Sequence, residues 1–370
     1  MSPRVDAMCR ESAVIVTCGT GGVGKTSVAA ALGLRAAQLG RRAVVITIDP
    51  ARRLADAIGL SGRLGNDPVL VDTGSSVTGE LWVTMLDVNE TFDNLVRDAS
   101  PTPERAREVM DNSFYRSLSR SLSGTRDYMA AERLHELHND DRFDLVVIDT
   151  PPSRNALDFL ESPERLANFL KHPLVRLLAA PGRGGMRLAN AALTPVLKVI
   201  SGVVGSDALS GVAAFLRSID GMEQEFSRRA LEVARTIRGD DTSFAVVASP
   251  APDALLEAGH FVDELHRLGI DLRLVVANRM PPRFGTTTSA EERVLAATGT
   301  GDEAIAHSVM ADLCEDAELA SAAMDGFTDH VRERFPDVAV ATAAEFASDI
   351  HDMRSVLLLA GQLAAPDDRQ

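Results

Sequence analysis

The sequence predicts an α/β fold, in which a doubly wound and mostly parallel β-sheet carries an inserted helical subdomain. Short apolar runs rich in Val and Ile recur along the 370 residues, as expected of buried strands. The first two runs are separated by one Ala- and Leu-rich helical segment, so strand, helix and strand follow within about 35 residues. Such a βαβ unit makes its two strands parallel. Long helical segments interrupt the later runs, which indicates insertions into the sheet domain.

Seven runs are predicted to be strands. In chain order they are 13–18, 43–48, 81–86, 143–148, 244–248, 270–277 and 337–341. Helices are expected at 27–38, 253–268 and 346–363. We interpret residues 1–370 as a single domain, with helical insertions at about 88–139 and 154–238 and a variable, more polar insertion at 284–335.

Composition limits the classes of function. The chain has 38 basic and 53 acidic residues and a formal net charge of −15, which opposes general binding to the phosphate backbone of nucleic acids. Its three cysteines, Cys9, Cys18 and Cys314, form no CxxC pair, so neither a disulfide framework nor a cysteine-based zinc site is expected. The start of the chain lacks the apolar core of a signal peptide. These features predict a cytoplasmic protein that does not bind nucleic acid.

The segment from Gly19 to Thr26 (GTGGVGKT) fits the pattern G-x-x-x-x-G-K-[ST], between a predicted strand and a predicted helix. Glycines allow successive main-chain N–H groups to turn inward around phosphate oxygens, and the helix directs its positive end to the same point. Lys25 would contact the β- and γ-phosphates, and the Thr26 hydroxyl would bind Mg²⁺. Only two other lysines, Lys171 and Lys198, occur in the chain, which makes a chance match less credible. The predicted phosphate-binding residues are Gly19, Thr20, Gly21, Gly22, Val23, Gly24, Lys25, Thr26 and Ser27.

An acidic residue that could bind Mg²⁺ directly follows the strand predicted at 143–148. The segment LVVID is an apolar strand that ends in Asp149, and this carboxylate would hold Mg²⁺ through a water molecule. The alternative is that Asp149 merely caps the next helix, but Pro151 and Pro152 favour an extended segment there. A segment of this kind is well placed to sense the γ-phosphate and to move when it leaves.

Four segments together resemble the ArsA/GET ATPases, which are P-loop NTPases of the deviant Walker A class: GTGGVGKTS, ITIDPARRLADAIG, VVIDTPPS and VVANR. The chain is most similar to the actinobacterial "anion-transporting ATPase" branch, whose members occur as paired paralogues. The resemblance runs from about residue 13 to 363. It implies a dimeric, Mg²⁺-dependent switch protein that binds ATP and ADP and hydrolyses ATP. It also implies two catalytic residues: Asp49, as the aspartate that activates water, and Lys25. The asparagine that binds adenine corresponds to Asn278, and Arg279 follows it as a further nucleotide-binding residue.

The chain departs from the family pattern in three ways. Thr20 stands where the family has its signature lysine, which in family dimers reaches the partner's nucleotide. A heterodimer with a paralogue carrying that lysine would therefore have one completed site. Arg52 and Arg53 replace a His-Asn pair after Asp49 and either add charge near the γ-phosphate or lie on the surface of the next helix. The cysteines that bind zinc or arsenite in family members are absent.

The output of the switch has several interpretations. Residues 188–216 are strongly apolar, although too interrupted for a membrane span. They would form a surface for a membrane protein or hydrophobic client, or else pack as ordinary helices. The chain is interpreted first as an ATP-hydrolysing subunit that couples a dimer conformational change to membrane-linked transport or client handling. The alternatives are a hydrolysis-poor, ATP-binding regulatory subunit of a heterodimer and a ParA/MinD-type positioning ATPase.

A pair of histidines, His135 and His138, lies one helical turn apart. No further ligand accompanies them, so a metal site is not predicted. Glu132 and Glu136 nearby predict that this is a solvated helix face.

Overall fold

A computed structural model of the chain describes residues 3–49, 53–60, 62, 64–75, 77–112, 115, 123–151, 156–171, 215, 219, 222–282 and 303–365. The strands are β1 Val14–Cys18, β2 Arg42–Thr47, β3 Val69–Leu70, β4 Glu80–Met85, β5 Leu145–Asp149, β6 Thr242–Ala248, β7 Leu272–Met280 and β8 Ala339–Ala344. The helices are α1 Pro3–Glu11, α2 Lys25–Gln38, α3 Arg53–Ile58, α4 Val88–Ala99, α5 Pro103–Met110, α7 Ser123–His138, α8 Ala156–Lys171, α12 Glu223–Ile237, α13 Pro252–Arg267, α15 Glu303–Arg334 and α16 Met353–Leu363.

The eight strands form one sheet in the order β3-β4-β2-β5-β1-β6-β7-β8. Neighbouring strands are parallel throughout, except that the two-residue β3 pairs antiparallel with β4. All seven predicted strands are present, with ends that differ by a few residues from the prediction. The sequence analysis did not predict β3, whose two residues are both exposed at the edge of the sheet. The predicted doubly wound, mostly parallel sheet is confirmed.

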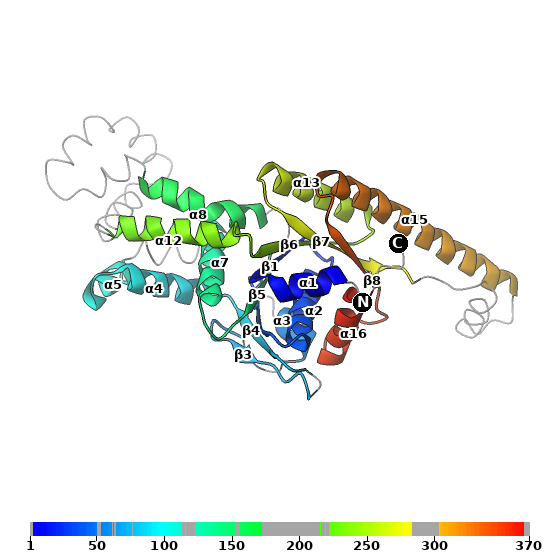
Figure 1. The fold of residues 1–370 in the computed structure, drawn as a ribbon, viewed down its shortest axis with the longest axis horizontal. Helices are drawn as coiled ribbons and strands as arrows, with labels where there is room; N and C mark the ends of the chain where they lie inside the picture. Colours follow the sequence, from blue (N-terminus) through cyan, green and yellow to red (C-terminus); the bar gives the residue numbers. More distant parts are fainter. Residues whose placement is uncertain are drawn as a thin grey trace.

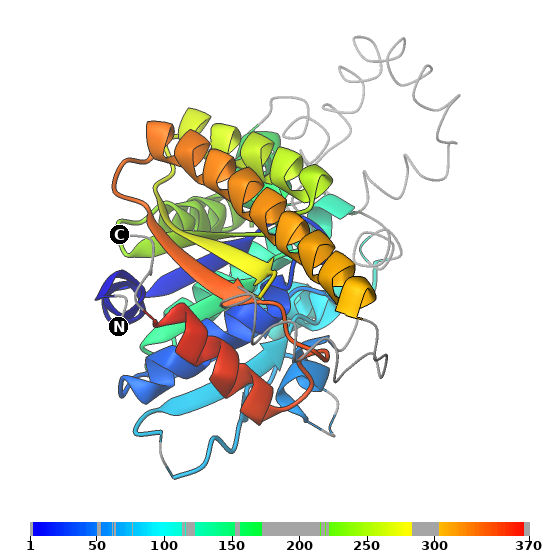
Figure 2. The same ribbon diagram turned by 90° about the vertical axis from the view of Figure 1, so that its right-hand side faces the viewer.

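Helices cover both faces of the sheet (Figures 1 and 2). Each face of the sheet has its own hydrophobic core, and successive side chains of β1 point alternately to the two faces. Ile15 belongs to one core, and its neighbours Val14 and Val16 belong to the other. Ile15 packs in the core that also contains residues of α1, α2, α3 and α16. Val14 and Val16 pack in the core shared with α7, α8, α12, α13 and α15.

The position of β1 determines where a ligand can bind. β1 lies between β5 and β6, and the chain leaves it toward β2 on one side, while β6, β7 and β8 continue on the other. At such a reversal of strand order, the crevice beyond the carboxyl ends of the strands is the usual ligand site of a doubly wound sheet. The loop after β1 opens into this crevice and leads directly into α2.

The segments predicted as insertions supply most of the remaining helices. Helices α4, α5 and α7 come from 88–139, and α8 and α12 come from 154–238. They gather at one end of the molecule in Figure 1, where α7, α8 and α12 contact one another. The segment 284–335 contributes α15, a 32-residue helix that packs along α13 and extends past the sheet. Apart from Phe215, the apolar stretch 188–216 lies outside the described residues.

Within the described ranges, none of the helices combines the length and the apolar character needed to cross a membrane.

The prediction of a solvated face around His135 was wrong. Glu132 is 0% exposed, because α12 covers this face of α7 and brings Arg229 against it. Arg229 Nε donates to Glu132 Oε1 at 2.6 Å, and the Tyr128 hydroxyl donates to Glu132 Oε2 at 3.1 Å. Glu132 of α7 therefore forms a buried ion pair with α12 of the neighbouring insertion, whereas Arg133 and Glu136 pair with each other on α7.

His135 lies in the same contact between α7 and α12. Because it is buried there, we expect the stability of the fold to depend on pH. Its Nδ1 is 2.7 Å from Thr236 Oγ1 of α12, and burial lowers its pKa to about 4, with Arg229 adding to the shift. A depressed histidine pKa means that the unfolded chain binds the extra proton first, so stability falls as pH drops from about 6.5 toward 4. The loss from this group is about 2 kcal/mol at pH 5.

We expect His135→Gln to remove that loss. Urea unfolding at pH 7 and pH 5 should give a smaller pH-dependent drop for His135→Gln than for the unchanged chain. His138→Gln, on the same helix but only half-buried, serves as the control and should keep the original drop. Equal drops for all three proteins would refute the prediction.

Candidate nucleotide-binding site

The loop between β1 and α2 fits tightly against the neighbouring strands. Gly19 has φ 149°, and a Cβ there would lie 2.2 Å from the Val247 carbonyl oxygen of β6. Gly24 has φ 91° and caps α2 without any side-chain hydrogen bond to its first turn. The first N–H groups of a helix have no partner within the helix, so they point toward an incoming acceptor. The glycines thus hold a main-chain surface suited to phosphate oxygens.

Lys25 is folded back onto this loop. Its Nζ donates to the Thr20 carbonyl oxygen at 2.7 Å, and the residue is 8% exposed. Burial holds the pKa of Lys25 below its usual value; the Asp149 carboxylate opposes this shift and the Arg53 guanidinium adds to it. The Lys25 ammonium group donates to one carbonyl of the glycine-rich loop, and it can donate to phosphate oxygens instead when a phosphate occupies the loop.

Asp149 lies at the end of β5 with two hydroxyls on one oxygen. Thr26 Oγ1 and Thr47 Oγ1 donate to its Oδ2 at 2.8 and 2.9 Å. Asp149 is 2% exposed, and its Oδ1 has no hydrogen-bond partner among the described residues. Burial raises the pKa of Asp149 to about 6, although both threonines and Lys25 oppose the shift.

This arrangement fits Mg²⁺. A buried carboxylate with one unsatisfied oxygen needs a cation, and a carboxylate next to a hydroxyl is a hard oxygen donor set. The described part of the chain contains no group of three or more His, Cys, Asp or Glu side chains that could hold a metal ion. Magnesium at phosphate sites takes only one or two protein oxygens and completes its shell with phosphates and water, so Thr26 and Asp149 suffice.

Asp49 follows β2 and is linked to the same network. Its N–H donates to Thr47 Oγ1 at 3.3 Å, and Thr47 in turn donates to Asp149. Asp49 Oδ2 lies 3.7 Å from Arg53 Nε, with the two side chains 28% and 65% exposed. Arg52 lies outside the described residues. The charge of Asp49 acts on Asp149, so the two carboxylates belong to one electrostatic network.

Asn278 supports the phosphate loop from β7. Its Nδ2 donates to the Val23 carbonyl oxygen at 2.7 Å, and a Cβ at Gly24 would lie 2.3 Å from that nitrogen. The amide oxygen of Asn278 is the group that could accept a hydrogen bond from a base. Arg279 follows with φ 57°, the only positive φ among the described non-glycine residues.

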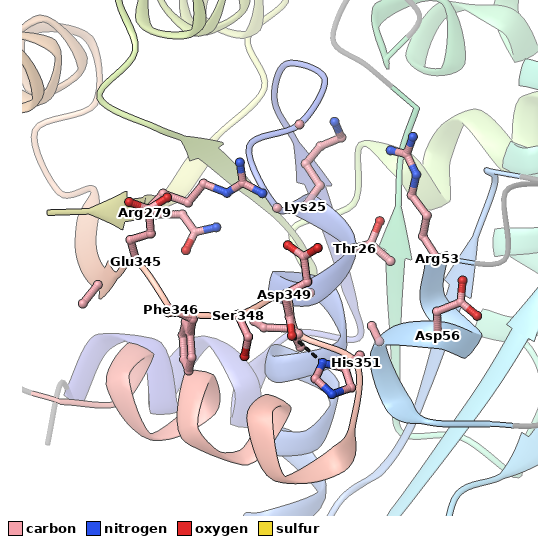
Figure 3. Close-up of a pocket in the computed structure, with 17 residues that line it drawn as sticks. Lys25, Thr26, Arg53, Asp56, Arg279, Glu345, Phe346, Ser348, Asp349 and His351 are labelled. Carbon is pink, nitrogen blue, oxygen red and sulfur yellow. Dashed lines mark hydrogen bonds between the residues drawn. The ribbon is translucent and has the colours of Figure 1, made fainter. Parts of the chain in front are cut away.

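A cavity of about 610 Å³ joins these residues (Figure 3). Its lining comprises Gly22, Gly24, Lys25, Thr26, Ser27, Arg53, Asp56, Ala57, Asn278, Arg279, Ala344, Glu345, Phe346, Ser348, Asp349, Ile350 and His351. Seven of the residues predicted to bind nucleotide are therefore brought together. The other predicted residues, Gly19, Thr20, Gly21, Val23, Asp49 and Asp149, do not line it. The volume lies within the range of roughly 300–1,000 Å³ that is usual for small-molecule sites.

The sequence analysis missed the segment that closes one side of this cavity. A helix was expected over 346–363, but α16 begins only at Met353. Asp352 caps the helix by accepting from the Ser355 N–H at 2.7 Å, so residues 345–351 stay in a loop. The Glu345 N–H donates to the Met280 carbonyl oxygen at 2.8 Å, which fixes the loop beside β7. The capping signal of an aspartate three residues before a serine could have located the true start.

Thr20 faces inward. It is 4% exposed, and its hydroxyl has no hydrogen-bond partner among the described residues. A short, uncharged and buried side chain cannot reach across to another subunit. Thr20 therefore cannot take the role that the signature lysine has in family dimers.

Two buried cysteines take no part in this chemistry, although Cys18 directly precedes Gly19 of the phosphate loop. Cys9 and Cys18 are buried and unpaired, and burial raises the pKa of each thiol to about 12. Neutral buried thiols are poor metal ligands and poor nucleophiles.

Comparison with known proteins gives a family match and several relatives. The family model described as "Anion-transporting ATPase" matches residues 12–291. An uncharacterised protein of Streptomyces coelicolor is 32% identical over 282 residues, which cover 72% of this chain and 62% of that protein. The ATPase ARSA2 of Chlamydomonas reinhardtii is 27% identical over 75% of this chain and 70% of its own length. The ATPase get3 of Aspergillus terreus is 23% identical over 76% and 77%.

The aligned segment thus spans less than two thirds of the Streptomyces protein, although it covers larger shares of the two ATPases. The family match covers most of the chain and includes the phosphate loop, Asp49, Asp149 and Asn278. The chain belongs to the anion-transporting ATPase (ArsA/GET) family.

Proposed function

We propose that this chain binds Mg²⁺-ATP in the 610 Å³ cavity and hydrolyses it to ADP and phosphate. The observation that carries the proposal is Asp149, a buried carboxylate that accepts from the Thr26 and Thr47 hydroxyls and has one oxygen with no hydrogen-bond partner in the described part of the chain. Few structural roles require such a group, since burying a charge is unfavourable unless it is paired. A cation bound between this carboxylate and a phosphate would supply the missing partner.

Each residue has a role in this proposal. The amides of residues 19–27 and the Lys25 ammonium group bind the phosphates. Thr26 and Asp149 hold Mg²⁺, which when bound neutralises charge on the β- and γ-phosphate oxygens. Asp49 accepts a hydrogen bond from the attacking water and orients it toward the γ-phosphorus. As the new bond forms, the bond from that phosphorus to the ADP oxygen breaks, so catalysis depends on positioning and charge.

The adenine end of the cavity is assigned to β7 and the loop 345–351. Asn278 already donates from Nδ2 to Val23, which leaves its oxygen to accept from the exocyclic amino group of adenine. Arg279 and Phe346 line the same end. An apolar ring and a planar guanidinium are suited to stacking on a base.

Calorimetry with Lys25→Met tests this proposal. The unchanged chain should bind ATP in the presence of Mg²⁺, and Lys25→Met should weaken binding about 10- to 100-fold, since a charge-assisted hydrogen bond is lost. Lys171→Met, an exposed lysine at the end of α8, is the matched control and should bind as before. Absence of any affinity for adenine nucleotide, or undiminished binding by Lys25→Met, would contradict the proposal.

We propose further that the chain acts in the cytoplasm as one half of a dimer. Cys9 and Cys18 are unpaired thiols, which suits a reducing compartment. The buried, uncharged Thr20 supports a heterodimer, because this chain offers no charge from that position to a partner's site. A paralogue with lysine at this position would complete the site of this chain, while its own site would stay incomplete. Mixing the two proteins should raise the ATPase rate above the sum of the separate rates.

The output is proposed to be membrane-linked transport or the handling of a hydrophobic client. The family description "Anion-transporting ATPase" supports a link to transport. The apolar composition of 188–216 supports an apolar surface that changes with the bound nucleotide. A second candidate, an ATP-binding subunit that hydrolyses poorly, is favoured only by Thr20.

A further inference from the structure

The basic side chains around the cavity are not equivalent. Among the described residues, those that line it are Lys25, Arg53, Arg279 and His351. Figure 3 shows Arg53 and Asp56 on one wall and Arg279 with Glu345 on the opposite wall. Lys25 is 8% exposed and bound to its own loop, whereas the Arg53 side chain is 65% exposed. Arg279 and His351 are exposed as well, but only Arg53 among these four residues is paired with Asp49, the proposed water-positioning residue.

The contact that now occupies Arg53 is weak. Its Nε lies 3.7 Å from Asp49 Oδ2, whereas Arg35 and Asp6 elsewhere in the chain meet at 2.8 Å with two nitrogens on two oxygens. An exposed pair one helical turn apart contributes little to stability. A stronger anion would displace Asp49 from Arg53 at small cost.

The position of Arg53 selects one end of a nucleotide. Asp49 is linked through Thr47 to Asp149, the proposed Mg²⁺ ligand. Arg53 and Lys25 also line the same cavity. Two cations held near each other repel unless an anion lies between them. The terminal phosphate, bound near Lys25 and Mg²⁺, is the anion that fits there.

We propose that Arg53 is a catalytic arginine that acts within its own chain, resting on Asp49 without nucleotide and transferring to the γ-phosphate when ATP binds. This inference rests on the proposed function and deepens it. A guanidinium matches phosphate oxygens with two parallel hydrogen bonds. An arginine supplied by the same chain stabilises the charge that spreads over the transferred phosphoryl group.

The exchange has a second consequence. Once Arg53 leaves, the Asp49 carboxylate oxygen that faced it, Oδ2, can accept a hydrogen bond from the attacking water. Arg53 itself forms and breaks no covalent bond; the water oxygen bonds to the γ-phosphorus, ADP departs with the electron pair of the broken P–O bond, and the protons of the water leave with inorganic phosphate. ADP has no γ-phosphate, so Arg53 returns to Asp49 after phosphate release. The pair would thus distinguish ATP from ADP within a single subunit.

The test compares two nucleotides in three variants. Calorimetry with Mg²⁺ gives the affinities for ADP and for a non-hydrolysable β,γ-imido analogue of ATP. Arg53→Gln should lose at least about 10-fold in affinity for the analogue and change its ADP affinity less than about twofold, because only the analogue reaches the guanidinium. The ATPase rate should fall at least about 100-fold. Arg53→Lys should keep part of the analogue affinity while staying slow, since a point charge lacks the fork.

Arg97→Gln is the matched control. Arg97 and Asp93 form an exposed pair with the same spacing in sequence, at 3.9 Å, on α4 and away from the cavity lining. Its loss should leave both affinities and the rate unchanged. An unchanged ratio of analogue to ADP affinity in Arg53→Gln would overturn the role of Arg53 and leave the ATPase proposal standing. Failure of the unchanged chain to bind either nucleotide would overturn both.

Discussion

Asp49→Asn should lower the rate of ATP hydrolysis at least about 100-fold, the usual range for losing a positioned acceptor of a proton or hydrogen bond. Its carboxylate is only 28% exposed and does not line the cavity. We therefore expect the affinity for Mg²⁺-ATP to change less than about threefold, because few ground-state contacts are lost. Phosphate release under saturating ATP and calorimetry measure the two quantities separately.

Asp93→Asn is the control for Asp49→Asn. Asp93 has the same spacing from Arg97 as Asp49 has from Arg53, so the control removes a similar surface pair far from the site. It should leave turnover unchanged. If Asp49→Asn leaves turnover unchanged in the assembled complex, the site of this chain is silent and the regulatory-subunit alternative is correct.

The elements around the candidate site whose positions were predicted from the sequence are those encoded locally. The spacing of Gly19, Gly24 and Lys25 fixes the phosphate loop, because glycine φ values and the helix start depend on adjacent residues. Asp149 could be placed because it directly follows an apolar run, and the ends of parallel strands meet at one edge of the sheet. The same reasoning located seven strands and missed β3, whose two residues give no periodic signal.

The parts that were missed depend on contacts between distant segments. Glu132 has the composition of a surface residue and is buried only because Arg229, almost a hundred residues away, covers it. Residues 346–351 were predicted to be helical, and the hydrogen bond from Glu345 to Met280 that fixes the start of their loop is not visible in the sequence. The contact of Asn278 with Val23 likewise arises only when β7 is placed beside the phosphate loop.

Asp149→Asn should have opposite effects on the empty and the loaded protein. The side chain is 2% exposed, and burial raises its pKa to about 6 from the usual value of 3.8. The ionised carboxylate is therefore unfavourable in the folded, nucleotide-free chain at neutral pH. A neutral amide of the same shape should raise the stability of that state by about 1–2 kcal/mol at pH 7, allowing for an imperfectly bonded NH₂ group.

The size of this effect depends on pH. A raised carboxyl pKa costs stability above pH 6, and that cost disappears as the folded state takes up its proton between about pH 6 and 4. The advantage of Asp149→Asn should accordingly shrink toward zero at pH 5. Thermal and urea unfolding at pH 7 and pH 5 measure the difference.

With Mg²⁺-ATP bound, the unchanged chain should be more stable than Asp149→Asn, the reverse of the order expected without nucleotide. Mg²⁺-ATP should stabilise the unchanged chain through mass action, whereas Asp149→Asn should lose at least about 100-fold of its Mg²⁺-dependent affinity and gain little. Asp144→Asn is the control, because Arg42 holds the pKa of Asp144 below its usual value. That change should destabilise the empty protein and leave the magnesium dependence intact. If Asp149→Asn instead destabilises the empty protein and keeps full Mg²⁺-dependent stabilisation, Asp149 serves the fold and the cation is bound elsewhere.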